Sequence, residues 1–316
     1  MDSLFALRTV AAEADTPHLP VPCRTDLVGS LAVAPPATEV EEWLVSSSRG
    51  VSHPVATLRL EFPMEEEAST VSVPHLAVRP DLRRMGIGRR VTEFAWARAR
   101  LRDRRRVLFA AEAGTDSGLL PAHHLARIIG ARPAMLFDHH RLDVRLAPPP
   151  AAVPADFTMC FWGNAVPEGL LAEAARLDAT LSPEVPAGGV GRTPRTASVL
   201  RVRGLEQMRI ARGRRAYQAG IWHVPTSRLV AWSAVSMTSS DSEHGLQAVT
   251  VVDPAHRLLG FERLVRAYNL ASVRASEAAF RTLDVWYDAD DVHLRRVNEE
   301  FGFRSVGTRY LWELPV

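Results

Sequence analysis

Alternating apolar and polar positions predict strands in the first half of the chain. Residues 55–62 alternate as a half-buried strand does, and residues 71–78 are a second strand candidate, whereas Val91, Phe94, Ala95 and Ala99 recur at helical spacing. The predicted order is a strand over 55–62, a strand over 71–78, a helix over 86–102, a strand over 107–111, a helix over 123–129 that stops at Gly130, and a closing strand over 142–146.

The second half repeats this order. It predicts strands over 216–223, 230–237 and 246–252, a helix over 259–275, a strand over 282–286, a helix over 292–300 and a final strand over 308–314. A strand, a Pro-containing turn, a helix, a strand, a helix, a glycine and a strand thus occur twice. The pattern indicates an internal duplication of one α/β unit.

A proline run separates the two copies. Pro148, Pro149 and Pro150 cannot continue a helix, and such runs commonly serve as stiff spacers. The chain has 316 residues, which fits two domains of usual size. We therefore expect an N-terminal domain over 1–148 and a C-terminal domain over 149–316.

Composition and charge exclude several classes of protein. Hydrophobic residues make up 47% of the chain, which is typical of a folded globular protein, and no apolar run is long enough for a membrane helix. The net charge is +2 and the basic residues apart from histidine are all arginine, so the strongly basic face of a nucleic-acid binder is not expected. Cys23 and Cys160 form no CxxC motif and the N-terminus shows no leader pattern, so we expect a cytoplasmic protein without a cysteine-rich metal site.

The most informative segment lies between the second strand and the first helix. Arg83-Arg84-Met85-Gly86-Ile87-Gly88 places glycines where a strand ends and a helix begins. Glycines let the backbone approach a ligand, and the free amides of a helix start favour negative charge. The loop is therefore a candidate phosphate cradle, although a glycine-bearing turn without a ligand has the same pattern.

This order Arg-x-x-Gly-x-Gly resembles the pyrophosphate loop of the GCN5-related N-acetyltransferase (GNAT) superfamily. The second half resembles tandem-domain members of the mycothiol synthase-like kind at Thr250, Asp253, Pro254, His256, Arg257, Asn269, Leu270, Trp286, Asn298, Gly302 and Phe303. The resemblance implies an α/β (α+β) fold class with two tandem GNAT folds, each a mixed, splayed central sheet flanked by helices.

The resemblance also implies a reaction and a donor site. Such proteins move an acyl group, here expected to be acetyl, from the pantetheine thioester of an acyl-CoA to the amine of a small molecule, in specialised metabolism or resistance, and need no metal. The implied donor-binding positions are Leu76, Ala77 and Val78 along the strand and Arg83, Arg84, Met85, Gly86, Ile87, Gly88 and Arg89 at the loop.

The corresponding loop of the second half departs from the motif. Glu262 stands where the last small residue of Arg257 to Glu262 should be, and its carboxylate would repel phosphates and take their space. We therefore expect the N-terminal domain to bind the donor and the C-terminal loop to be degenerate. The same departure argues against mycothiol synthase activity itself.

Candidate catalytic residues are less sharply marked. The family often uses a tyrosine four residues before the glycine that ends the later helix, but Ala126 stands there and all four tyrosines lie in the second half. His75 on the central strand, Glu112 at the next strand end and His124 are the local substitutes for acid–base work. Each also has a structural interpretation, as a packed histidine, a solvated strand end or a helix-start surface residue.

The acidic segment after the strand over 282–286 is a candidate acceptor site. Tyr287, Asp288 and Asp290 could recognise a cationic acceptor, although a solvated loop between strand and helix is the simpler interpretation. The segment lacks the glycine and the terminal glutamate of a calcium loop.

Three alternatives remain from the sequence. The acyl group could come from the phosphopantetheine of an acyl carrier protein, whose acidic surface would suit Arg83, Arg84 and the arginines of 102–106. The chain could instead be a non-catalytic acyl-CoA sensor or scaffold. Transfer from an aminoacyl-tRNA is disfavoured by the near-neutral charge.

Overall fold

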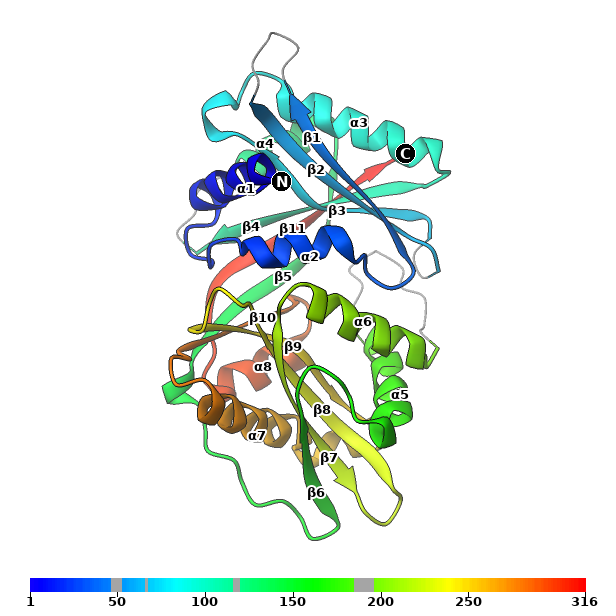
Figure 1. The fold of residues 1–316 in the computed structure, drawn as a ribbon, viewed down its shortest axis with the longest axis vertical. Coiled ribbons are helices and arrows are strands. Elements are labelled where there is room, and N and C mark those ends of the chain that lie inside the picture. The colour runs from blue at the N-terminus through cyan, green and yellow to red at the C-terminus, as the bar shows by residue number, and fades with distance from the viewer. Residues whose placement is uncertain (47–52, 66–67, 116–119, 185–195) are drawn as a thin grey trace. The chain divides into compact units, whose positions relative to one another are not determined.

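The computed structural model describes residues 1–46, 53–65, 68–115, 120–184 and 196–316, and its contacts divide the chain into two compact units. Of the described residues, unit 1 comprises 1–138 and 306–316, and unit 2 comprises 139–184 and 196–305. Both ends of the chain therefore belong to unit 1, as the red strand beside β4 in Figure 1 shows. The division of the duplicated sequence at 148/149 stays a prediction.

Unit 1 is a mixed sheet with helices. Its strands, in spatial order, are β1 (Thr38–Ser46), β2 (Pro54–Pro63), β3 (Thr70–Val78), β4 (Arg106–Gly114), β11 (Arg304–Pro315) and the first part of β5 (Arg132–Asp143). Its helices are α1 (Asp2–Asp15), α2 (Arg24–Ala32), α3 (Ile87–Leu101) and α4 (Pro121–Ile129), with the 3₁₀ turn η1 (Pro80–Leu82) after β3. The pair β3–β4 is parallel, whereas β1–β2, β2–β3 and β4–β11 are antiparallel.

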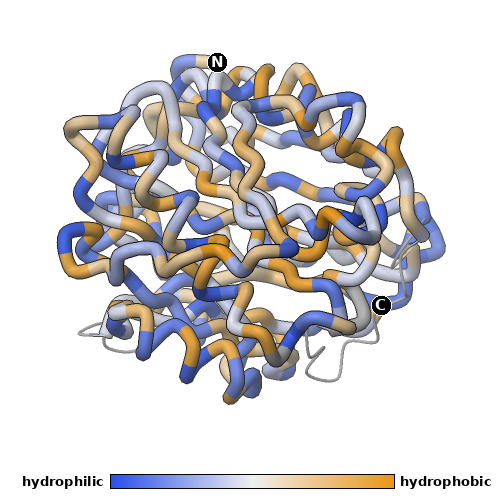
Figure 2. The backbone as a smooth tube through the Cα atoms, turned by 90° about the horizontal axis from the view of Figure 1, so that it is seen from below, coloured by the Kyte–Doolittle hydropathy of each residue, from blue (hydrophilic) through white to orange (hydrophobic). Residues whose placement is uncertain are grey.

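The core of unit 1 lies between this sheet and α3. Seven consecutive residues of β2, from Pro54 to Leu60, are buried, because a central strand is covered on both faces. Val91, Ala95 and Ala99 of α3 pack against them, which confirms the helical stripe predicted from the sequence. Figure 2 shows hydrophobic and hydrophilic residues interspersed along the backbone, as this layered packing requires.

Unit 2 repeats the arrangement. Its strands, in spatial order, are the end of β5, then β10 (Thr282–Asp288), β9 (His244–Val252), β8 (Arg228–Met237), β7 (Arg215–His223) and β6 (Phe157–Trp162). Its helices are α5 (Glu168–Glu184), α6 (Val199–Ala211), α7 (Phe261–Ser276) and α8 (Val292–Phe301), with 3₁₀ turns η2 (Val144–Leu146) and η3 (Pro254–Leu259). The predicted elements occur in the predicted order in both halves, apart from the two strands corrected below. The sequence analysis did not predict α1, α2, β1, β6, α5 or α6.

Both units share one departure from a continuous sheet. In unit 1 the parallel pairing of β3 with β4 ends at Val73 and Phe109, although both strands continue. In unit 2 the pairing of β9 with β10 ends at Leu246 and Asp284. The strands splay apart beyond these points, and each unit therefore has a gap at the carboxyl ends of its two central parallel strands.

Two strand predictions need correction. The closing strand expected over 142–146 begins earlier, as β5, and Val144–Leu146 form a 3₁₀ turn in which Asp143 accepts the amide of Arg145. The strand predicted over 308–314 exists as β11, but it pairs with β4 of unit 1, with Tyr310 opposite Ala111. Alternation predicts that a strand forms, and it does not specify which strand becomes its neighbour.

Candidate active site

The gap between β3 and β4 opens into a pocket of about 410 Å³ in unit 1. Its walls are the end of β3, residues 109–111 of β4, the helix α4, the first turn of α3 with the preceding loop, and one side chain from β11, Trp312. All predicted donor-binding positions except Met85 line this pocket. Met85 is not among the lining residues and is 69% exposed.

The end of β3 offers its backbone to this pocket. Leu76, Ala77 and Val78 pair on one side with β2, opposite Leu58, Thr57 and Ala56. On the other side the pairing with β4 has already ended at Val73. Backbone groups that face the gap are therefore available to an extended amide chain, which would bond to them as an added strand does.

The loop at the rim is shaped for close approach. Arg84 and Gly86 both have left-handed backbone, with φ of 67° and 79°. A Cβ at Gly86 would meet no atom within 4 Å, so the backbone is bare on that side. Gly86 is also the N-cap of α3 and no side chain caps the helix, which leaves the first amides of α3 free to bind an anion.

Arg83, the first arginine of the loop, is already held by unit 1 itself. Its Nη1 and Nη2 donate to the two carboxylate oxygens of Asp15, at 2.7 and 2.8 Å, and its Nε donates to the carbonyl of Val78 at 3.2 Å. Asp15 is the last residue of α1 and also lines the pocket. The pair fixes the guanidinium at the rim and offsets its charge.

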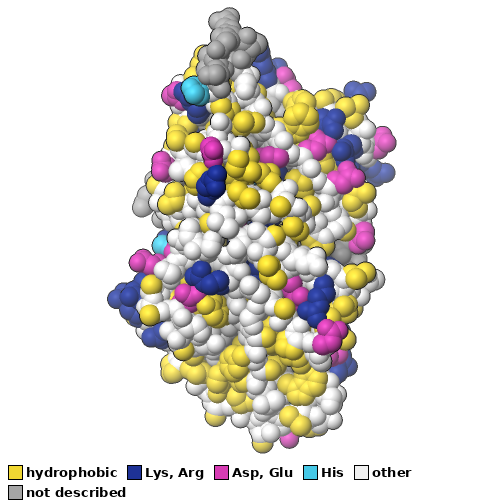
Figure 3. Space-filling model, in the orientation of Figure 1, with side chains coloured by type: hydrophobic (Ala, Val, Ile, Leu, Met, Phe, Trp, Pro, Cys, Tyr) yellow, Lys and Arg dark blue, Asp and Glu magenta, His cyan; other side chains and the backbone are white. Residues whose placement is uncertain are grey.

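Two other arginines at the rim are more exposed. Arg84 and Arg89 both line the pocket, and Arg89 forms an i,i+4 ion pair with Glu93. On the face drawn in Figure 3, arginine and carboxylate side chains lie close together at several places, so positive charge is not gathered in one patch of that face.

His124 is the only one of the three predicted catalytic residues that lines the pocket. Desolvation, followed by the positive charges of Arg84 and Arg127, lowers the pKa of His124 below its ordinary value of 6.5. The imidazole is therefore neutral at neutral pH, which is the form that accepts a proton.

The other two candidates lie outside the pocket lining. His75 is exposed on β3, where its Cα lies opposite that of Arg59 on β2. Glu112 on β4 forms an ion pair with Arg309, its neighbour on β11. The catalytic role of Glu112 stays a prediction, as does that of His75.

Sequence reasoning missed the residues that α1 and β11 bring to the site. Trp312 lines the pocket, and Tyr310 lies on the same face of β11, with ring centroids 6.5 Å apart. His123, between two lining residues of α4, contacts both rings at 4.6 and 5.6 Å. The β11 alternation was visible in the sequence, but its partner strand was not. No sequence signal marks Asp15.

The predicted acceptor residues lie in unit 2, where β10 leads into α8. Tyr287 is buried in the core and its hydroxyl lies 3.0 Å from Nε2 of His140. Asp288 is 2% exposed, and one carboxylate oxygen accepts the amide of Asp290 at 3.0 Å. Asp290 is the most exposed of the three. Their role in acceptor binding stays a prediction.

Within residues 1–46, 53–65, 68–115, 120–184 and 196–316, no group of three or more His, Cys, Asp and Glu side chains is arranged to hold a metal ion. None of the helices described above is long and apolar enough to span a membrane.

Comparison with solved structures gives the family. A tandem GNAT protein from the clavulanic acid biosynthesis pathway, solved without acetyl-CoA, is 30% identical, with a TM-score of 0.86 over 99% of this chain and 94% of that one. A GCN5-related N-acetyltransferase from Sphaerobacter thermophilus is 18% identical, with a TM-score of 0.67 over 99% and 91%, and shares the fold. No protein-family model and no curated sequence matches the chain. With central parallel strands that splay apart in each unit and this relative along nearly its whole length, the chain belongs to the tandem GCN5-related N-acetyltransferases and is an N-acyltransferase of that type.

Proposed function

We propose that unit 1 binds an acyl-CoA, with acetyl-CoA as the first choice, and transfers its acyl group to the amine of a small molecule in specialised metabolism or resistance. The observation that carries the proposal is that the β3–β4 gap and the glycine loop open into the same pocket. The relative from clavulanic acid biosynthesis supports the specialised pathway.

The residues of unit 1 fit such a donor. The backbone of Leu76 to Val78 offers amide and carbonyl groups to a pantetheine arm, which itself contains two amides. The bare backbone at Gly86 and the free amides of the first turn of α3 suit a diphosphate, and Arg84 and Arg89 add positive charge.

Acyl transfer also requires proton movement. The amine nitrogen bonds to the thioester carbonyl carbon as the carbon–sulfur bond breaks, a proton leaves the nitrogen, and the thiolate takes up a proton. His124, neutral and at the pocket, is positioned to accept the first proton. The hydroxyl of Tyr310, brought by β11, is a candidate donor of the second.

The acceptor is proposed to be cationic before it reacts, as most amines are. Asp290, Asp288 and Tyr287 are the proposed recognition residues. No metal is required for the chemistry, because the amine is itself the nucleophile.

The test is calorimetric titration of acetyl-CoA into the wild type and into Gly86→Trp and Gly260→Trp, at one salt concentration. The two glycines are a matched pair, because both have left-handed φ (79° and 72°) and a Cβ at either meets no atom within 4 Å. We expect Gly86→Trp alone to abolish binding. Loss of binding only in Gly260→Trp would place the donor site in unit 2.

Absence of wild-type binding would exclude free CoA as donor. The exposed Arg84 and Arg89 at the rim favour one second candidate, an acyl carrier protein whose acidic surface docks there. An acylated carrier protein would then be titrated in the same three-protein series. Binding of acetyl-CoA without turnover of any amine would leave the acyl-CoA sensor.

A further inference from the structure

The two units can be compared position by position at their strand gaps. β3 and β9 each have nine residues and end at Val78 and Val252, and eight residues later Gly86 and Gly260 start α3 and α7 with left-handed φ. The helices α4 and α8 likewise end at glycines with left-handed φ. Residues at the same sequence distance from these strand ends and glycines are therefore counterparts in the two units.

Arg266 of α7 is the unusual residue in this comparison. Its side chain is 4% exposed, although an arginine is almost never buried unless its charge is compensated. Nε donates to the hydroxyl of Thr250 on β9 at 2.9 Å, and Nη1 donates to the side-chain oxygen of Asn298 on α8 at 2.7 Å. The guanidinium thus connects the splayed end of β9 to the helix that follows β10.

The two anchors of Arg266 occupy positions that line the pocket in unit 1. Thr250 lies two residues before the end of β9, as Leu76 does in β3, and Asn298 lies four residues before the helix-ending glycine, as Ala126 does. Leu76 and Ala126 both line the open pocket of unit 1.

A smaller residue stands in the position of Arg266 in unit 1. This residue is Thr92, whose hydroxyl turns back to the carbonyl of Gly88 within its own helix. It therefore projects nothing into the gap of unit 1.

Glu262 has a structural partner in this arrangement. Its Oε1 lies 3.6 Å from Nη2 of Arg266, and its Oε2 lies 3.5 Å from Nε2 of His293. Its side chain is only 17% exposed. The carboxylate that replaces a small residue of the loop is thus the counter-ion of the buried arginine, and the two substitutions depend on each other.

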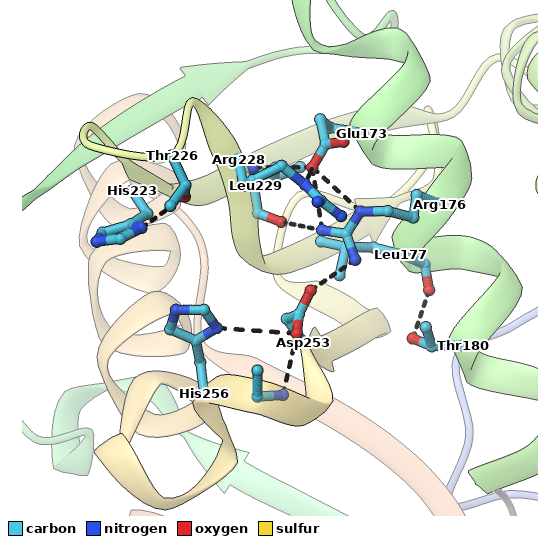
Figure 4. A network of polar contacts seen from close by, with 11 residues as sticks. Glu173, Arg176, Leu177, Thr180, His223, Thr226, Arg228, Leu229, Asp253 and His256 are labelled. Carbon is cyan, nitrogen blue, oxygen red and sulfur yellow. Dashed lines mark hydrogen bonds and ion pairs between the residues drawn. The ribbon is translucent and has the colours of Figure 1, made fainter.

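The loop of unit 2 is also held by polar contacts from α5. Figure 4 shows Arg176 of α5 bonded to Asp253, which caps η3, while Glu173 holds Arg176 and Arg228. The Arg176–Asp253 contact is 2.6 Å, and Asp253 also accepts the amide of Ala255. The segment after β9, which begins at Asp253, is therefore held in place by side chains of unit 2 itself.

We propose that the side chain of Arg266, with Glu262 as its counter-ion, fills the strand gap of unit 2. The chain therefore binds one donor molecule, in unit 1. Unit 2 contains a second site that is closed and that substitution of Glu262 and Arg266 would open. The proposal rests on the proposed function in taking the pocket of unit 1 as the donor site.

The experiment gives unit 2 the residues of unit 1. Glu262→Gly with Arg266→Thr copies Gly88 and Thr92, and the filled control is Glu262→Gln with Arg266→Met, which removes the charges and keeps the bulk. Calorimetry with CoA, on chains shown to be folded by circular dichroism, gives the stoichiometry. We expect one CoA per wild-type chain, two per opened chain and one per filled control.

Two CoA molecules on the wild type, or one on a folded opened variant, would overturn the proposal. If the opened variant does not fold, the single variant Gly86→Trp, in which unit 2 is unchanged, provides the test. Absence of bound CoA in this variant would support a closed site in unit 2, and residual CoA binding would overturn the proposal. The same experiment distinguishes failure of this proposal from failure of the proposed function. If the wild type binds no CoA, the proposed function fails, but the opened variant would still bind one CoA if Arg266 closes the gap of unit 2.

Discussion

The contact between Arg83 and Asp15 predicts that removing a negative charge outside the loop tightens donor binding. Asp15→Asn keeps the size of the side chain and one oxygen that can accept from Arg83, so the guanidinium stays in place. The change leaves the rim one charge more positive. In the wild type, Nη1 and Nη2 of Arg83 donate to the Asp15 carboxylate at 2.7 and 2.8 Å. In Asp15→Asn one of these two groups becomes available to donate to a phosphate.

The size of the effect follows from Coulomb's law. A phosphate on the far side of the guanidinium would lie about 6 Å from the Asp15 carboxylate, and two unit charges at that distance repel by ~0.7 kcal/mol in water and ~3 kcal/mol at an effective dielectric constant of ~20. Asp15 is 35% exposed, so the value should lie near the lower limit. About 1 kcal/mol corresponds to roughly fivefold tighter binding of acetyl-CoA.

The assay is calorimetric titration of acetyl-CoA at low and at high salt. The control is Glu93→Gln, which removes the same charge from an ion pair whose two side chains are 64% and 58% exposed, and should change affinity by less than twofold. The advantage of Asp15→Asn should shrink as salt rises. Weaker binding by Asp15→Asn, or an advantage that does not respond to salt, would refute the reasoning.

Four further outcomes are expected. Because the pKa of His124 is lowered, the acid limb of the kcat/KM profile should lie below pH 6.5, and His124→Gln should remove it. Tyr310→Phe should lower kcat and leave the KM for acetyl-CoA nearly unchanged; equal losses in Tyr310→Phe and Trp312→Phe would point to packing instead. Gly307→Ala places a Cβ 2.3 Å from the carbonyl oxygen of Ala113, so urea denaturation should show a loss of ~1–3 kcal/mol. Burial raises the pKa of the Cys160 thiol to about 11, so at pH 8 only about one molecule in a thousand is thiolate and alkylation at this residue should be slow, with a rate that rises about tenfold per pH unit.

The elements that carry a clear hydrophobic period were predictable from local pattern, whereas α1, α2, β1, β6, α5 and α6 and the neighbours of the strands were not. The strand over 55–62 and the helix over 86–102 have a clear period of two or of 3.6, and the structure contains them as β2 and α3, with the strand candidate over 71–78 as β3. The pattern in 308–314 also predicted a strand correctly. Its place beside β4 depends on long-range pairing, which alternation leaves open.

The donor loop was predictable because its chemistry lies in consecutive residues, and the rest of the pocket was not. The residue types from Arg83 to Gly88 themselves predict an exposed backbone at the start of a helix. Asp15 and Trp312 reach the same pocket from the two ends of the chain, and neither type nor spacing singles them out. When distant segments of a chain form one site, the sequence predicts only the segment that carries a recognisable motif.

The duplication shows why a retained pattern does not imply a retained site. Both units keep the backbone features of the gap, with the left-handed glycine before the helix and strands that part early. What differs is a small set of side chains. Thr92 leaves the gap of unit 1 open, whereas Arg266 in unit 2 spans to Thr250 and Asn298. Because a buried arginine is unfavourable without a counter-ion, its presence explains Glu262, which from sequence alone resembled decay of a phosphate loop. The polar groups of the gap in unit 2 are thus joined to one another by the unit's own side chains.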